Sequence, residues 1–239
     1  MRKPRRLAPE ALQPFVWELP ERLRGRWGDR TKADTTEGEP EAPAAKIDWP
    51  TLYGNDHPVE IEVGFGKGLF LVNEGVANPD RNYFGIEIIR KYQLYAATRV
   101  ANRGLPNVKT CCADAKIVMR EFVVPGTVSI VHVFFPDPWW KNKHKKRLLF
   151  TPEFATLTND VLKRGGQLHF VTDVQDYFEM VTETLRHCPG FEELPQPPEP
   201  APVHDMDYLT NFERKFRKEG RPIYRSRYVK IVPTIPVRN

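Results

Sequence analysis

The amino-acid sequence predicts an α/β fold in which a doubly wound, mostly parallel sheet carries helices on both faces. Three observations support this prediction. From residue 58 onward, short runs rich in β-branched and aromatic residues alternate with helical stretches at the spacing of βαβ units. The apolar run at 128–135 has the length of a parallel strand buried on both faces. The chain has 239 residues, 40% of them apolar, which suits one such domain with additional arms.

The expected elements follow one another in a regular order. Short apolar runs predict strands at residues 59–63, 83–87, 108–112, 128–135, 167–172 and 223–232. The stretches between them predict helices at residues 69–77, 91–102, 152–163, 177–187 and 211–218. Six prolines within residues 189–202 interrupt the alternation before the last helix and strand.

Residues 1–55 lack sustained periodicity, since Arg-rich, Pro-containing and acidic stretches succeed one another there. We expect an N-terminal arm that is partly disordered, with one short helix near residues 20–26. Residues 56–239 are then expected to form the folded domain, which ends in a basic segment.

Composition narrows the class of protein. No stretch approaches the roughly 20 apolar residues of a membrane-spanning helix, and no apolar core follows the basic N-terminus as in a secretion signal. Three cysteines, two of them adjacent, cannot form a disulfide framework and favour a reducing compartment. Six histidines without an i, i+4 pair give no metal site. We therefore expect a cytoplasmic protein that binds no metal.

Positive charge is concentrated in two segments. The net charge is only +5, yet residues 141–147 carry five Lys or Arg and residues 214–230 carry eight, with Glu219 as the one acid. These 24 positions sum to +12, so the remaining 215 residues sum to −7. The pattern favours a surface that meets a polyanion. The alternative is that both segments are ordinary solvated surface.

A glycine-rich turn after the first strand predicts a cofactor site. Gly64, Gly66 and Gly68 follow the strand at 59–63, and glycine lets the backbone turn tightly and lets a ligand approach it. The spacing differs from the dinucleotide fingerprint G-x-G-x-x-G. Glu62 precedes the turn and suits a ligand with an ammonium group rather than a pyrophosphate. The cofactor expected here is S-adenosyl-L-methionine.

Two further acids follow the next two strands. Glu87 ends the strand at 83–87 and is suited to accept both ribose hydroxyls of an adenosine. Asp114 comes just after the third strand, where its side chain can face the adenine ring or simply cap the next helix. Ligands of open α/β sheets bind at the carboxyl ends of strands, so the coincidence of these acids favours a binding site.

The segment after the fourth strand predicts the chemical site. Asp137 stands between Pro136 and Pro138, which fix the backbone on either side of it, and Trp139 offers a flat face for a base. The alternative is a strained turn covered by an aromatic residue.

These motifs together resemble the tRNA (guanine-N7)-methyltransferase family, which methylates guanine 46 in the tRNA variable loop. The resemblance runs from about residue 58 to 230 in the pieces Ile61-Glu-Val-Gly-Phe-Gly, Gly85-Ile-Glu, Ala113-Asp-Ala, Phe134-Phe-Pro-Asp-Pro-Trp-Trp-Lys-Asn-Lys-His-Lys-Lys-Arg, Val171-Thr-Asp-Val and Thr210-Asn-Phe-Glu. It implies a seven-stranded, Rossmann-like class I methyltransferase fold.

The resemblance also implies residue roles. The residues implied to contact or border S-adenosyl-L-methionine are Glu62, Gly64, Gly66, Glu87, Asp114 and Asp137, of which Asp137 is also implied to be catalytic. Those implied to bind substrate are Lys141, Asp173, Thr210, Asn211, Phe212 and Glu213, and those implied to contact RNA are Lys143, His144, Lys145, Lys146, Arg147 and Leu148. Leu148 departs from the family pattern, in which a second Arg is common there.

Guanine N7 has an in-plane lone pair and carries no proton, so its methylation needs alignment and charge stabilisation rather than a base. A carboxylate can also accept hydrogen bonds from guanine N1–H and N2–H₂. Our hypothesis is that Asp137 or Asp173 makes this contact, with Glu213 as a third candidate.

Three other functions compete with this prediction. They are an RNA-binding protein without chemistry, a nicotinamide-dependent oxidoreductase, and a methyltransferase that acts on an exocyclic base amine. The intact acids oppose the first, and the glycine spacing with Glu62 opposes the second. We expect tRNA as the partner and a monomer or homodimer without an obligate partner subunit.

Overall fold

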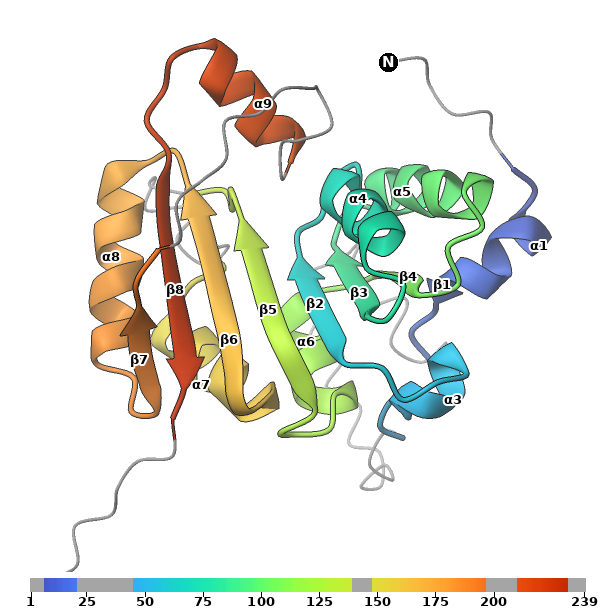
Figure 1. The fold of residues 1–239 in the computed structure, drawn as a ribbon, viewed down its shortest axis with the longest axis horizontal. Coiled ribbons are helices and arrows are strands. Elements are labelled where there is room, and N and C mark those ends of the chain that lie inside the picture. Colours follow the sequence, from blue (N-terminus) through green and yellow to red (C-terminus); the bar gives the residue numbers. More distant parts are fainter. Residues whose placement is uncertain (1–6, 21–44, 139–147, 197–209, 232–239) are drawn as a thin grey trace, which may run out of the picture.

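The computed structural model describes residues 7–20, 45–138, 148–196 and 210–231. Within these ranges the chain forms one eight-stranded sheet with the order β1-β4-β3-β2-β5-β6-β8-β7 (Figure 1). The strands in chain order are β1 Val16–Trp17, β2 Val59–Val63, β3 Asn82–Glu87, β4 Val108–Cys112, β5 Val128–Phe134, β6 Leu162–Thr172, β7 Phe191–Leu194 and β8 Tyr224–Lys230. Strands β1 to β6 pair in parallel, and β8 runs antiparallel to both β6 and β7.

Helices cover both faces of this sheet, so the predicted doubly wound fold is confirmed (Figure 1). The longer helices are α4 Leu69–Ala77, α5 Arg90–Asn102, α7 Pro152–Val161, α8 Gln175–Arg186 and α9 Asn211–Lys218. The shorter ones are α1 Pro9–Leu12, the 3₁₀ turn Gln13–Phe15, α3 Trp49–Tyr53, α6 Ala115–Ile117 and the π-helical turn Val118–Phe122. Every strand and helix predicted from residue 59 to 232 has a counterpart.

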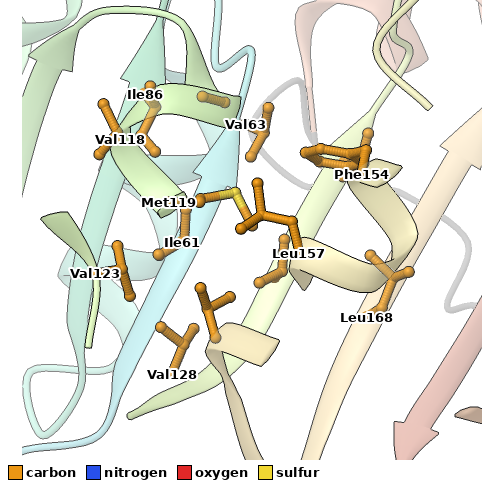
Figure 2. Close-up of a cluster of buried hydrophobic side chains, with 14 of the residues drawn as sticks. Ile61, Val63, Ile86, Val118, Met119, Val123, Val128, Phe154, Leu157 and Leu168 are labelled. Atoms are coloured by element: carbon orange, nitrogen blue, oxygen red, sulfur yellow. The ribbon is translucent and has the colours of Figure 1, made fainter. Parts of the chain in front are cut away.

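Each face of the sheet buries its own apolar cluster. The larger cluster joins strand residues such as Ile61 and Ile86 to Met119, Phe154 and Leu157 from the helices on one face (Figure 2). The smaller cluster packs α4 and α5 on the other face. Because both faces are covered, the strands read as continuous apolar runs, and all five residues of β2 are buried.

The sheet has one strand more than the seven implied by the resemblance, because Val16–Trp17 pairs with β4. Other parts of residues 7–20 and 45–55 also join the core. Tyr53 donates a hydrogen bond from its hydroxyl to the carbonyl of Tyr83 (2.8 Å), and Trp49 Nε1 donates to Thr127 Oγ1 (3.0 Å). The division between arm and domain at residue 55 stays a prediction. The helix expected near residues 20–26 lies mostly outside the described residues.

The strand order places a topological switch point between β2 and β5. From β2 the chain continues outward through β3 and β4, whereas β5 starts the series that leads to β6 on the other side. Open α/β sheets bind ligands outside the carboxyl ends of the strands at such a point. In the described part of the chain, no helix has the length and apolar character needed to cross a membrane.

Candidate active site

Acidic residues lie at the carboxyl ends of five parallel strands. Glu62 is the penultimate residue of β2, Glu87 ends β3, Asp114 follows β4, Asp137 follows β5 and Asp173 follows β6. Parallel strands end at the same edge of the sheet, so these acids surround the switch point between β2 and β5. The five strand-end acids named from the sequence therefore share one edge of the molecule.

The glycine turn combines open space with tight helix packing. Gly64, Gly66 and Gly68 have φ values of 76°, 55° and 66°, which favour glycine. A Cβ atom added at Gly64 or Gly66 would meet no atom within 4 Å, whereas one at Gly68 would lie 2.6 Å from Ala96 Cβ. The first two glycines therefore leave room for a ligand against the backbone, and the third allows α4 to approach α5.

Glu62 carries a buried carboxylate. It is only 3% exposed, and its Oε2 atom has no hydrogen-bond partner among the described residues. Burial raises the pKa of Glu62 well above its usual value, and repulsion from Glu87 and Glu74 raises it further. A cationic ligand would both satisfy this oxygen and stabilise the carboxylate form.

Glu87 ties the glycine turn to the end of β3. Its Oε2 accepts a hydrogen bond from the backbone N–H of Gly66 and its Oε1 accepts one from Ile89, both at 2.9 Å. Burial raises the pKa of Glu87 despite these donors, and Asp137 contributes to the same increase. Each carboxylate oxygen can accept more than one hydrogen bond, so Glu87 remains able to accept hydrogen bonds from the hydroxyl groups of a ligand.

Asp114 caps a helix. Its Oδ1 accepts a hydrogen bond of 2.7 Å from the backbone N–H of Lys116 at the start of α6. This is the capping alternative that the sequence left open. A ligand contact by Asp114 stays a prediction.

Asp137 lies in an unusual turn at the end of β5. Phe135, two residues earlier, has a φ of 50° and is the one non-glycine residue with positive φ in the described ranges. Its N–H donates to the carbonyl of Val171 (2.7 Å), which holds the turn on β6. Such a conformation costs about 1–3 kcal/mol and persists where surrounding structure enforces it. The turn leaves the Asp137 side chain exposed, close enough to Glu87 to affect the pKa of that carboxyl.

Helix α9 is placed over the carboxyl ends of the strands (Figure 1). Phe135 contacts Phe212 and Phe216 of this helix, with ring centroids 6.4 and 5.4 Å apart. Phe212 remains 52% exposed and offers an aromatic face. Asn211, which precedes it, is partly buried.

The polar residues that begin α9 make structural contacts. Thr210 is the N-cap, and its Oγ1 accepts a hydrogen bond of 3.0 Å from the N–H of Glu213. Glu213 is buried and its Oε1 pairs with Arg217 (2.9 Å) and Arg225 (2.6 Å). A guanine contact by Glu213 stays a prediction.

Asp173 is also held in an ion pair. Its carboxylate pairs with Arg221, and the Arg221 guanidinium lies over the Phe216 ring, 4.2 Å from its centroid. No local pattern indicates the role of Arg221 or the positive φ of Phe135, because both depend on how α9 and β6 meet. Among the three carboxylates proposed to read guanine, Asp137 is the exposed one.

Trp139, predicted to offer a face for a base, and Lys141, predicted to bind substrate, lie outside the described residues. The same is true of most of the predicted RNA-contacting segment, namely Lys143, His144, Lys145, Lys146 and Arg147. Leu148 is described and is partly buried against the larger core cluster, and its carbonyl accepts from Lys116 Nζ (3.3 Å). The described residues contain no cluster of three His, Cys, Asp or Glu that could hold a metal ion.

Comparison with known proteins identifies the family. Residues 56–226 match the family model described as "Putative methyltransferase". The tRNA (guanine-N(7)-)-methyltransferase of Rhodopirellula baltica is 44% identical over 197 residues, which cover 80% of this chain and 73% of that protein. The protein of the same name from Pasteurella multocida is 33% identical over 77% of this chain and 72% of its own length. The chain belongs to the tRNA (guanine-N7)-methyltransferase family.

Solved structures show the same fold at lower identity. The aminoglycoside resistance methyltransferase NpmB1 superposes with a TM-score of 0.54 and 21% identity, covering 73% of this chain and 87% of that one. A variant of the 16S rRNA (adenine(1408)-N(1))-methyltransferase from Catenulisporales acidiphilia, solved with its cosubstrate SAM, gives 0.56 and 17%, covering 80% and 95%. This member of the guanine-N7 family therefore has a class I methyltransferase fold, as the resemblance implied.

Proposed function

We propose that the protein transfers a methyl group from S-adenosyl-L-methionine to N7 of guanine 46 in the variable loop of tRNA. The observation that carries the proposal is the buried Oε2 atom of Glu62, which has no hydrogen-bond partner among the described residues and lies beside an open glycine turn at the switch point of a methyltransferase fold. The names of the relatives support the base and the atom. The position in the tRNA follows from the family resemblance.

The residues at the switch point fit the proposed cofactor. Glu62 would hold its ammonium group, because a buried carboxylate oxygen without a donor requires one. Glu87 would accept hydrogen bonds from the ribose hydroxyls. Gly64 and Gly66 leave the space that a ligand needs to lie against the turn. Bound there, S-adenosyl-L-methionine supplies an electrophilic methyl group on a sulfonium.

The proposed reaction requires little acid–base catalysis by the protein. Guanine N7 has a lone pair and no proton to lose, so its methylation would require no base from the protein. The methylated purine would be cationic, and a carboxylate of this chain near the ring would stabilise the charge that develops. The main contribution of the protein is to hold the reacting atoms in line at about 3 Å.

Asp137 is our choice for the residue that faces the guanine. It is exposed at the end of β5, whereas Asp173 and Glu213 already pair with arginines. A carboxylate at this position can accept from guanine N1–H and N2–H₂, which adenine does not offer. The exposed ring of Phe212 is suited to stack on a nearby base.

The remaining predicted residues would bind the phosphates of the tRNA. Lys141, Lys143, Lys145, Lys146 and Arg147 would contact phosphates, since five cations within residues 141–147 follow directly on the Asp137 turn. We expect the enzyme to act in the cytoplasm as a monomer or homodimer, without an obligate partner subunit.

Paired substrates test the proposal. A tRNA transcript with guanine at position 46 and a matched transcript with adenine there are incubated with the protein and methyl-labelled S-adenosyl-L-methionine. We expect label in the first and at least 100-fold less in the second. Equal labelling of both transcripts would refute the assignment of position 46.

A further inference from the structure

A wide groove lies over α5, beside the glycine turn. Its volume is about 1430 Å³, and it is lined by α5, by residues 7–18, by Lys67 of the glycine turn and by Asn211 and Arg214 of α9. We call it the α5 groove. Sites for small ligands usually measure about 300–1,000 Å³, so the α5 groove has room for part of a polymer.

The lining of the α5 groove carries an excess of positive charge. Five described lining residues are basic and two are acidic, namely Lys67, Arg90, Lys91, Arg99 and Arg214 against Glu10 and Glu18. Glu18 pairs with Arg90 at 3.0 Å, which neutralises one of the cations. Lys67 and Lys91 are exposed and form no ion pair within the described ranges. The groove is therefore complementary to a polyanion.

Arg99 is a buried cation that pairs with no carboxylate of the described residues. It is 3% exposed, its Nη1 donates to the carbonyl of Lys67 (3.0 Å), and its Nη2 has no hydrogen-bond partner in the part of the chain described. Burial lowers the pKa of Arg99, and the charge of Arg103 lowers it further. The contacts of the Arg99 guanidinium do not fully compensate the cost of burying its charge. An anion in the groove would supply the missing hydrogen-bond acceptor and a negative charge.

The groove also offers aromatic and apolar surface. Tyr92 and Tyr95 of α5 line it and are partly buried, and Leu94 between them is 38% exposed. Cationic grooves interleaved with aromatic rings are typical of surfaces that bind unpaired nucleotides, because phosphates meet the cations and bases stack on the rings. An acidic protein segment would use the cations but gain less from the tyrosines.

We propose that the α5 groove binds the sugar-phosphate backbone and an unstacked base of the RNA flanking the target guanine. Lys67 and Arg214 connect the groove to the glycine turn and to α9, so nucleotides next to a guanine in the active site can reach it. Arg99 and Lys91 contact phosphates and Tyr95 stacks on a base. This inference rests on the proposed function, since it takes the RNA to be the methyl acceptor.

The first experiment compares a groove variant with a matched charge reversal. The double variant Lys91→Glu/Tyr95→Ala alters the α5 groove, and Lys163→Glu alters an exposed lysine at the start of β6, near the opposite end of that strand from the active site. Binding of unmodified tRNA is measured by fluorescence anisotropy between 50 and 300 mM salt, a range of about sixfold over which phosphate contacts change affinity strongly.

We expect the groove variant to bind tRNA at least tenfold more weakly at low salt than Lys163→Glu does. The magnitude of the slope of log K against log salt should also fall by about 0.7–0.9 for each phosphate that the variant no longer neutralises. A Kd and slope within twofold of those of Lys163→Glu would overturn the proposal. A glutamate-rich peptide that competes as well as RNA of equal charge would overturn the assignment to RNA.

A second variant tests Arg99 itself. Arg99→Met keeps most of the length of the side chain but removes the charge, and affinities for tRNA and for S-adenosyl-L-methionine are measured in parallel. Weaker tRNA binding with cofactor affinity within twofold of wild type supports the proposal. Loss of cofactor affinity with unchanged tRNA binding would show that Arg99 only supports the glycine turn, and would contradict it.

The two proposals can fail separately. If wild-type protein methylates guanine N7 and the groove variants bind tRNA normally, the groove assignment fails and the proposed function stands. If the groove variants lose RNA affinity but wild-type protein transfers no methyl group to tRNA, the proposed function fails while an RNA-binding groove remains.

Discussion

Replacement of Glu62 by glutamine should weaken cofactor binding while stabilising the ligand-free protein. The structure leaves Glu62 Oε2 buried without a donor in the described residues, so the carboxylate is costly until a cation binds. A charge-assisted hydrogen bond contributes about 1.5–3 kcal/mol. Its loss in Glu62→Gln should raise the Kd for S-adenosyl-L-methionine by about 10- to 150-fold.

The stability of the ligand-free protein should depend on pH through the raised pKa of Glu62. Because the pKa of Glu62 is raised in the folded protein, the unfolded chain loses this proton at lower pH than the folded chain does. Stability of the ligand-free protein therefore falls as pH rises from the ordinary glutamate pKa through the raised one, by about 1.4 kcal/mol for each unit of difference. Glu62→Gln should remove this fall. Cofactor affinity of wild type should rise over the same window, with proton release on binding.

Glu60 is the matched control for this prediction. It lies on the same strand and face, but pairs with His132 (2.7 Å) and Arg81 (2.5 Å). Burial opposes its ionisation, yet hydrogen bonds from His132 and Arg81 outweigh burial and lower the pKa of Glu60. Glu60→Gln should lower the free energy of unfolding by about 1–3 kcal/mol and leave cofactor affinity unchanged.

Calorimetric titration in buffers of different ionisation enthalpy measures both the Kd and the protons released, and urea unfolding measures stability. A Kd for Glu62→Gln within threefold of wild type would show that Glu62 does not bind the cofactor. Equal loss of cofactor affinity in Glu60→Gln would contradict the prediction as well, because the effect would then not depend on the unpartnered oxygen.

Asp137, the glycine turn and the basic segment give three further predictions. In a steady-state assay, Asp137→Ala should lower kcat for methyl transfer by about 30- to 1,000-fold, equivalent to about 2–4 kcal/mol. Activity within threefold of wild type would exclude Asp137 as the guanine contact. Gly68→Ala places a Cβ 2.6 Å from Ala96 of α5, at a φ of 66°. Gly54 also has a positive φ, but a Cβ added there meets no atom within 4 Å, so Gly54→Ala should cost only roughly 1–2 kcal/mol. Urea unfolding should therefore show a larger loss of stability for Gly68→Ala than for Gly54→Ala. Lys145→Ala/Lys146→Ala should flatten the salt dependence of tRNA binding, and an unchanged slope would remove both lysines from the interface.

Local sequence was sufficient for the central elements. The bounds of β2, α4, β4 and α9 coincide with those predicted, because each is an apolar or amphipathic run with clear termini. The strand-end acids could be placed on one edge because parallel strands share a direction. Their chemistry follows from that topology.

Tertiary contacts decide the features that the sequence did not reveal. Val16–Trp17 has only two residues and becomes a strand because β4 offers an open edge, and Phe191–Leu194 contains two glutamates whose side chains do not indicate a strand. Both depend on partners distant in the chain, which short-range patterns do not encode.

The start of α9 shows how one motif can carry two meanings. Thr210-Asn-Phe-Glu213 is interpreted through the family as a substrate segment, yet Thr-x-x-Glu is also the pattern of a helix N-cap. The structure shows the cap and places Glu213 between two arginines. Asp114 is similar, since its cap accounts for its position without a ligand.

Identification of the modified nucleoside decides whether the protein methylates guanine N7. Purified protein is incubated with methyl-labelled S-adenosyl-L-methionine and unmodified tRNA, and the RNA is digested to nucleosides and separated. We expect the label to elute as 7-methylguanosine. Label in a base methylated on an exocyclic amine, or no label above a control without protein, would contradict this expectation.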